Sequence, residues 1–212
     1  QWDLNDTGSI AEDFRGLADG QITGANSAWD ANKSSNVLTF DGTDDFISFG
    51  DLDEMDQIDR FTFSIWFKRT SDTSSTPTNH GVHNILLGQS SGGSNDNLEI
   101  GTNGSNVQLY VDSGSAETDA TVTFDAGLVN DRWYHLAVVY GSELSLFLDG
   151  VKISTWTQYN GRLESSQASP LSIGVARPNS NRWGDFSGSL AEARIYLSEL
   201  SDEEIGILAG GS

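Results

Sequence analysis

The stretch that most constrains the fold is the run of residues 133–150, WYHLAVVYGSELSLFLDG. Over Tyr134–Tyr140 the side chains alternate between two faces, and after a Gly-Ser pair the same alternation resumes over Leu144–Leu148. Alternation on both sides of a short turn predicts an antiparallel hairpin. Asp149-Gly150 tolerates the positive φ values of another tight turn, so we expect a third strand over Val151–Trp156 and hence a three-stranded meander.

Another strand is expected over Phe61–Phe67, FTFSIWF. Its odd-numbered side chains are all large and apolar and should fill the core of a sandwich, whereas the even-numbered ones should face the other way. The second set is Thr62, Ser64, Trp66 and Lys68. For Trp66 two interpretations remain open: it lines a concave ligand surface, or it packs beneath a crossing loop.

Length and composition are typical of one all-β domain. A chain of 212 residues with 36% hydrophobic residues and 23 glycines suits a single sandwich with many turns. No apolar run approaches the roughly 18 residues of a transmembrane helix. Cysteine is absent from the sequence, which excludes disulfides, thiol nucleophiles and cysteine-based zinc sites.

The chain is strongly acidic, with 31 Asp and Glu against 11 Lys and Arg, a formal net charge of -20. Such a surface repels phosphate backbones and anionic lipids, so we expect neither nucleic acid nor membrane insertion among its interactions. The excess of carboxylates has two interpretations, which are bound Ca²⁺ and a solubilising surface suited to extracellular surroundings.

Several segments, taken in order, resemble the motifs of laminin-G-like (concanavalin A-like) jelly-roll domains. The tryptophan-led hairpin ending in LFLDG resembles the core of that family, and FTFSIWF resembles its central strand. Other similar segments are 13–16 (DFRG), 38–46 (LTFDGTDDF), 171–174 (LSIG), 186–196 (FSGSLAEARIY) and 200–205 (LSDEEI). The resemblance covers almost the whole chain and implies that residues 1–212 form one domain. The expected fold is an all-β, two-sheet antiparallel jelly-roll β-sandwich with one short C-terminal helix.

The first part of the chain, residues 1–36, is polar and irregular and should wrap around the sandwich as short strands and loops. The side chains expected to anchor it are Trp2, Ile10, Phe14, Leu17, Ile22 and Trp29. Farther along, the acidic stretch 51–59 precedes a buried strand, and we expect it to form a solvated turn or a short helix.

The end of the chain carries two further expectations. In the last strand, Ser189–Tyr196, alternation would place Leu190, Glu192 and Arg194 on one face, where the two charges should pair or meet a metal. The segment Ser201–Glu204 has the sequence of a capping box and should begin a short helix.

The acidic turns could supply the oxygen ligands that Ca²⁺ requires, which number roughly six to eight. The turn DGTDD at residues 41–45 is the first candidate. The predicted metal ligands, together with backbone carbonyls of the same turns, are Asp13, Asp19, Asp44, Asp45 and Glu192. Members of the similar family often have an Asp where this chain has Ala191.

The loop at residues 176–185, ARPNSNRWGD, has a lectin-like composition. Amide and guanidinium groups hydrogen-bond sugar hydroxyls, and an indole stacks on the apolar face of a pyranose. The predicted ligand site draws on this loop and on three other polar loops: Arg177, Asn179, Asn181, Trp183, Tyr159, Asn79, His80 and Asp96. The alternative is that Trp183 folds back onto the sandwich and the asparagines only hold turns.

These features favour a non-catalytic, Ca²⁺-dependent, lectin-like recognition domain of a secreted or cell-surface bacterial protein. Its Ca²⁺ would be structural and able to bridge to the glycan. A peptide- or protein-binding module of a bacterial adhesin is the alternative, and in either case we expect neighbouring domains in a larger chain. An enzyme ranks third, because no Ser-His-Asp set and no Glu-x-Asp-x-Glu strand is found in the sequence. A structural spacer without a ligand ranks fourth.

Overall fold

The computed structural model describes residues 1–90, 98–113, 120–164, 169–179 and 182–210. Its strands are β1 (Ile10–Ala11), β2 (Gly20–Thr23), β3 (Asn26–Asp30), β4 (Ser35–Asp41), β5 (Phe46–Ser48), β6 (Phe61–Arg69), β7 (Leu87–Gln89), β8 (Leu98–Asn103), β9 (Asn106–Val111), β10 (Val122–Asp125), β11 (Tyr134–Tyr140), β12 (Leu144–Leu148), β13 (Val151–Trp156), β14 (Ser172–Ile173) and β15 (Ser187–Tyr196). A 3-10 helix, η1 (Asp53–Met55), lies in the acidic stretch, and one α-helix, α1 (Asp202–Leu208), follows the last strand.

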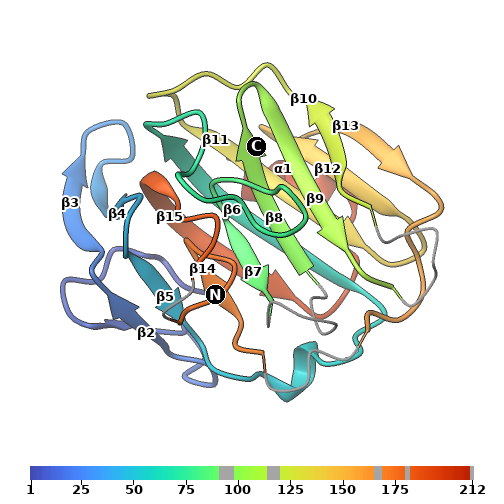
Figure 1. Cartoon of the computed structure of the whole chain (residues 1–212), viewed down its shortest axis with the longest axis horizontal. Helices are drawn as coiled ribbons and strands as arrows, with labels where there is room; N and C mark the ends of the chain where they lie inside the picture. The colour runs from blue at the N-terminus through green and yellow to red at the C-terminus, as the bar shows by residue number, and fades with distance from the viewer. Residues whose placement is uncertain (91–97, 114–119, 165–168, 180–181, 211–212) are drawn as a thin grey trace.

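The strands form two antiparallel sheets, and in Figure 1 β8 and β9 (light green) lie in front of β6 (teal). The eight-stranded sheet has the order β1-β2-β5-β14-β7-β8-β9-β10, and the seven-stranded sheet has the order β13-β12-β11-β6-β15-β4-β3. The main apolar core draws side chains from both sheets. This arrangement confirms the predicted two-sheet sandwich.

The predicted meander is present as β11, β12 and β13 at one edge of the seven-stranded sheet. β11 and β12 pair from Leu136 opposite Leu148 to Tyr140 opposite Leu144. The Asp149-Gly150 turn has positive φ at both residues, 49° and 81°, as expected for a tight hairpin. The alternation of side chains and the Asp-Gly turn therefore determine this part of the fold.

β6 lies in the middle of the seven-stranded sheet, between β11 and β15. Phe61, Phe63, Ile65 and Phe67 are completely buried in the main core, as their alternation predicted. Burial of each such side chain stabilises a fold by about 1.5–3 kcal/mol. β6 is therefore a principal source of stability for both sheets.

β15 departs from simple alternation, so the predicted grouping of Leu190 on one face with Glu192 and Arg194 is wrong. The pairing of β15 with β6 shifts between Ala191 and Arg194, and Glu192 adopts a left-handed φ of 52° within this β-bulge. The bulge lets both Leu190 and Ala193 reach the main core, which strict alternation would place on opposite faces. Leu190 is thereby separated from the two charged residues.

The expected N-terminal anchors divide into two groups. Trp2 and Ile22 are buried, but the other four are exposed, so their predicted anchoring is wrong: Ile10, Phe14, Leu17 and Trp29. The loop that carries two of them is held by polar contacts, because Asp13 Oδ2 accepts the Leu17 N–H (3.0 Å) and Asp19 Oδ1 accepts the Asp13 N–H (2.9 Å). Its shape does not depend on burying its apolar side chains.

Helix α1 begins at the predicted capping box. The Glu204 N–H donates to Ser201 Oγ (3.3 Å), and the Ser201 N–H donates to Glu204 Oε2 (2.7 Å). Ile205 then packs in a small apolar cluster with outward-facing side chains of β11 and β12. None of the helices in the described ranges is long and apolar enough to cross a bilayer.

Two loops, residues 70–86 and the described residues of 174–186, pack on the outer face of the eight-stranded sheet near β7 and β8 (Figure 1). A Cβ on Gly88 of β7 would meet the backbone of Ala176, and a Cβ on Gly101 of β8 would meet the carbonyl oxygen of His83. Glycine at these two strand positions allows the loop backbones to approach the sheet closely.

On the outer face of the seven-stranded sheet, Trp66 packs beneath Lys33, which comes from the turn between β3 and β4. Lys33 Nζ lies 3.2 Å from the centroid of the Trp66 ring, and burial lowers the pKa of Lys33 to about 8. The ring of His135 lies beside Trp66, with the centroids 5.3 Å apart. Of the two interpretations of Trp66, packing beneath a crossing segment is the one that the structure supports.

A methyl group at residue 101 should disturb the loop above it. In Gly101→Ala the added Cβ would overlap the His83 carbonyl oxygen, and overpacking of this kind costs about 1–3 kcal/mol. Urea unfolding should register this loss, whereas Gly8→Ala should behave like the parent chain, because nothing lies within 4 Å of a Cβ there. Equal stability of the two variants would contradict the close approach.

Folding stability should depend on the protonation of His135. Burial, together with the charges of Arg194 and Lys33, lowers the pKa of His135 from 6.5 to about 4. Between these values the unfolded chain binds a proton that the folded chain does not, so stability should fall as the pH drops from 6.5 to 4. His135→Asn should lack this component, on the order of 3 kcal/mol, in urea unfolding across that pH range. An unchanged pH dependence in the variant would rule out His135 as the titrating group.

Candidate functional site

The two loops that cover the eight-stranded sheet are joined by main-chain hydrogen bonds. The Ile85 N–H donates to the Gly184 carbonyl (2.7 Å), and the Gly184 N–H donates to the Thr76 carbonyl (2.7 Å). Residues 76–85 and the described residues of 175–184, together with the strand residues beneath them, are called the loop platform below. It presents side chains from distant parts of the sequence on one surface.

Glu99 is a fully buried carboxylate beneath the loop platform. Its neighbours along β8 point into the main core, so the Glu99 side chain points to the outer face of the sheet, towards the loops. Neither of its oxygens has a hydrogen-bond partner within the described residues. The Nδ1 atom of His80 lies 3.3 Å from Glu99 Oε2. A buried carboxylate with so few donors is costly, and its complete burial keeps it out of reach of a ligand on the surface of the platform.

His80, one of the predicted ligand residues, is held rigidly beside Glu99. Its ring stacks on Tyr110 of β9, with the centroids 3.5 Å apart and the planes 4° apart. Its carbonyl oxygen accepts the hydroxyl of Thr121 (2.6 Å). Tyr110 in turn belongs to a small apolar cluster with side chains from both loops. The loop platform therefore unites His80 with the loop at 175–184.

Arg177 and Trp183 form the other half of the loop platform. The Arg177 Cζ lies 3.9 Å from the centroid of the Trp183 ring. Arg177 is buried and Trp183 is partly exposed. A guanidinium group on one face of an indole fixes its orientation and leaves the other face for a stacking partner. Asn179, exposed at the tip of this loop, donates its N–H to the Arg177 carbonyl (2.9 Å).

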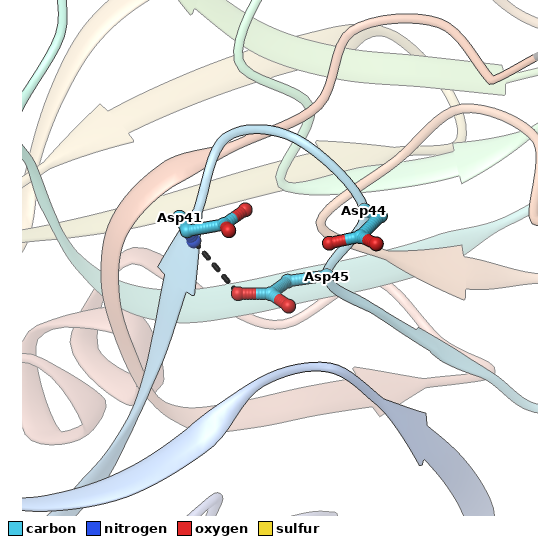
Figure 2. A group of neighbouring side chains, drawn as sticks. All are labelled: Asp41, Asp44 and Asp45. Atoms are coloured by element: carbon cyan, nitrogen blue, oxygen red, sulfur yellow. Dashed lines mark hydrogen bonds between the residues drawn. The ribbon is translucent and has the colours of Figure 1, made fainter.

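The turn between β4 and β5 gathers three carboxylates, which face one another in Figure 2. Ligand atoms of Asp41, Asp44 and Asp45 all lie within 4.8 Å of one another. Asp45 is buried, and its Oδ2 accepts the Asp41 N–H (2.7 Å). Burial raises the pKa of Asp45, and the charges of Asp41 and Asp44 add to the rise. A cation would relieve this repulsion, and an all-oxygen set of donors suits Ca²⁺.

Arg182 connects this acidic turn to the loop platform. Its Nη2 donates to the carbonyl oxygen of Thr43 in the turn (3.0 Å), and its Nε donates to Asp185 Oδ1 (3.3 Å). Burial raises the pKa of Asp185, although the charge of Arg182 opposes the rise. Because Arg182 directly precedes Trp183, the metal candidate and the ligand candidate are neighbours.

The five predicted metal ligands do not come together. The part of the chain that the structure describes contains one group of three or more potential ligand side chains, the acidic turn, and this group includes Asp44 and Asp45. Asp13 and Asp19 instead accept backbone N–H groups of their own loop. Glu192 pairs with Arg194 (2.9 Å) and with a lysine (3.8 Å), which agrees with the expected ion pair.

The remaining predicted ligand residues have different environments. Tyr159 is buried in the main core, and its hydroxyl donates to the Ala120 carbonyl (3.0 Å). We therefore remove Tyr159 from the candidate site, because it presents no surface to a ligand. Asn79 is exposed in the turn next to His80. Asp96 and Asn181 lie outside the described residues.

Glu99 and Tyr110 were not identified from the sequence. Both lie in strands whose apolar neighbours indicated burial, and the loops that bury them come from elsewhere in the chain. A usable signal was present for Glu99, since a charged side chain in the middle of an apolar strand requires a partner or a function.

Ser64 and His135 form a pair that resembles the serine and histidine of a hydrolase catalytic triad. Ser64 Oγ lies 2.9 Å from His135 Nε2, the kind of contact that activates a serine nucleophile. Both residues are completely buried. We interpret the pair as an internal contact of the seven-stranded sheet.

Solved structures with a similar fold include binding domains of toxins and chains of glycosidases. The binding domain of Paraclostridial Mosquitocidal Protein 1 has a TM-score of 0.71 at 13% identity, covering 98% of this chain and 51% of that one. Trypanosoma rangeli sialidase in complex with the inhibitor DANA has a TM-score of 0.69 at 16% identity, covering 98% and 32%. Domain 4 of AbnA, a GH43 extracellular arabinanase from Geobacillus stearothermophilus, in complex with arabinotriose, has a TM-score of 0.61 at 20% identity, covering 98% and 93%.

The chain thus spans about half the length of the first of these structures and about a third of the second. At these identities the likeness concerns the fold alone. A comparison with curated proteins finds no match. The family profile described as the Concanavalin A-like lectin/glucanases superfamily matches residues 41–206, which is most of the chain. Together with the two-sheet jelly roll, this match shows that the chain belongs to the concanavalin A-like lectin/glucanase superfamily.

Proposed function

We propose that this chain is a non-catalytic glycan-recognition domain that binds its ligand at the loop platform. The observation that carries the proposal is the partly exposed Trp183, whose ring centroid lies 3.9 Å from the Arg177 Cζ on a surface that also presents Asn79 and Asn179. Sugar hydroxyls are suitable hydrogen-bond partners for such exposed amides.

The exposed part of the Trp183 indole can stack on the apolar side of a sugar ring, while the Arg177 guanidinium group holds its orientation. Stacking and hydrogen bonding to hydroxyls are the two contacts that pyranose recognition combines. Asn79 and Asn179, both exposed on the platform loops, add amide groups at its rim.

Proteins of similar fold agree with a binding role. One is the binding domain of a mosquitocidal protein, and another is an arabinanase domain in complex with arabinotriose. The sialidases among them leave enzymatic activity open. Our proposal of a non-catalytic role is supported by the burial of the Ser64 and His135 pair. We extend it to an extracellular or cell-surface location, where glycans and free Ca²⁺ are abundant, within a larger bacterial protein of the adhesin type.

We also propose that Ca²⁺ binds at the acidic turn and supports the loop platform. The ligands would be Asp41, Asp44 and Asp45. Through Arg182, which donates to the Thr43 carbonyl, the position of this turn is tied to the loop that carries Trp183. A bound ion would thus order both the turn and the adjoining ligand loop.

Two substitutions test the loop platform on a broad glycan array. Trp183→Ala removes the stacking surface, and Asn79→Ala removes an exposed amide at the rim. Each should weaken glycan binding, Trp183→Ala by about tenfold or more.

Trp29→Ala is the matched control, since this tryptophan is 68% exposed on the edge strand β3. It should bind glycans as the parent chain does. Full glycan binding by both platform variants would refute the assignment of this site, and an array without any hits for the folded parent chain would refute the glycan proposal itself.

The metal proposal has its own test in thermal unfolding with and without Ca²⁺. A ligand at about a hundred times its Kd stabilises the folded state by about 2.7 kcal/mol. Ca²⁺ should therefore raise the unfolding temperature of the parent chain and of Asp51→Asn, an exposed carboxylate outside the turn, but not that of Asp44→Asn. A Ca²⁺ shift of equal size in Asp44→Asn would exclude the acidic turn.

A further inference from the structure

The sequence contains two Asn-Gly pairs, Asn103-Gly104 and Asn160-Gly161. An asparagine followed by glycine is chemically labile, because the absence of a Cβ lets the glycine nitrogen approach the Cγ of the asparagine side chain. In a folded protein this approach also requires a nitrogen that is not held in a hydrogen bond and a segment that can change its conformation. The structure gives the two pairs opposite surroundings.

The first pair is held in place at the hairpin between β8 and β9. Asn103 ends β8 and lies opposite Asn106, whose side-chain amide donates to the Asn103 carbonyl (3.1 Å). The Gly104 N–H donates to the carbonyl of Asp72 (3.0 Å), which belongs to a different loop. Attack by this nitrogen on the Asn103 side chain would therefore break a bond between two distant segments of the fold.

The second pair lies free of such contacts. Asn160 and Gly161 are both exposed and belong to neither a strand nor a helix. None of the hydrogen bonds between described residues uses the Gly161 N–H. A Cβ at Gly161 would meet nothing within 4 Å, so no neighbouring atom crowds the approach to its nitrogen. The Asn160 side-chain amide donates to the Thr157 carbonyl (2.7 Å), a contact within the same loop.

The exposed segment 160–162 connects two residues that are fixed in the main core, Tyr159 and Leu163. The Tyr159 hydroxyl donates to the Ala120 carbonyl (3.0 Å), and the Leu163 N–H donates to the Ile58 carbonyl (2.9 Å). The segment is therefore a short arch with anchored ends. A change in its main-chain length is transmitted to both anchors, because a packed core tolerates little displacement.

We propose that Asn160 is a site of spontaneous deamidation, from which Asn103 is protected by the fold. The Gly161 nitrogen forms a bond to Asn160 Cγ, and the bond from Cγ to Nδ2 breaks. The proton of the Gly161 N–H passes through solvent to the departing group, which leaves as ammonia. The product is a five-membered succinimide, and water then opens it at either carbonyl. The overall change consumes one water and releases one ammonia.

The two products differ in their effect on the arch. Opening at the side-chain carbonyl gives aspartate, which keeps the length of the main chain. Opening at the main-chain carbonyl gives isoaspartate, which routes the chain through Cβ and adds one carbon between Tyr159 and Leu163. Both products add a negative charge to a chain whose formal net charge is already -20. The modification is independent of glycan recognition at the loop platform.

The first test ages the folded parent chain in mildly alkaline buffer and follows each Asn-Gly pair by peptide mapping with mass spectrometry. Conversion at Asn160 should be faster than at Asn103 by about tenfold or more, because protection follows the local stability of the fold. The two rates should converge when the chain is aged in concentrated urea. Equal rates in the folded chain, or faster conversion at Asn103, would overturn the proposal.

The second test separates the site from its structural consequence. Asn160→Ser should stop most labelling of the aged chain by an isoaspartate-specific methyltransferase, whereas the matched variant Asn103→Ser should label like the parent chain. Asn160→Asp carries the added charge without the added carbon, so it should unfold at the temperature of the fresh parent chain, while the aged parent should unfold at a lower one. Equal labelling of aged Asn160→Ser and parent would overturn the site, and an unchanged unfolding temperature after isoaspartate has formed would overturn the coupling to the anchors.

Discussion

Burial of the inner side chains of β6 between the two sheets is the constraint on which the other elements depend. A slip of one residue would exchange its aromatic and aliphatic face for the face that carries Ser64 and Trp66. β11 and β15 lie on either side of β6 and must therefore match its register. β15 meets this requirement with a bulge at Glu192, so that its apolar residues remain in the core although their spacing is irregular.

The outer faces of the two sheets are covered in different ways. This difference explains why the proposed binding site lies on the eight-stranded sheet. On the seven-stranded sheet, α1 and the Lys33 turn lie directly over apolar and aromatic side chains. On the eight-stranded sheet, glycines at β7 and β8 let two loops settle against the strands and enclose a carboxylate that has few donors. The first cover completes the fold, whereas the second brings exposed side chains of both loops together on one surface.

The sequence predicted the structural features that depend on residues close together in the chain. The meander, the inner face of β6 and the capping box at Ser201 follow from alternation and from short motifs, and all three are confirmed. Predictions that needed distant partners were less successful. Leu17 was expected to anchor a loop that its own aspartates hold, and the bulge in β15 is invisible to an alternation pattern. Among the ligand residues, His80, Arg177 and Trp183 do share one surface, but the buried Glu99 beneath them depends on long-range packing.

Arg182 has a consequence for how the two proposed ligands would influence each other. Its guanidinium group is hydrogen-bonded to the acidic turn on one side, and its backbone continues directly into Trp183 on the other. If a cation in the turn alters the position of Arg182 and thereby the affinity for a glycan, the glycan must alter the affinity for the cation by the same factor. A single arginine would then make the occupancy of each site a function of the concentration of the other ligand, and the domain would bind most tightly only where both are present.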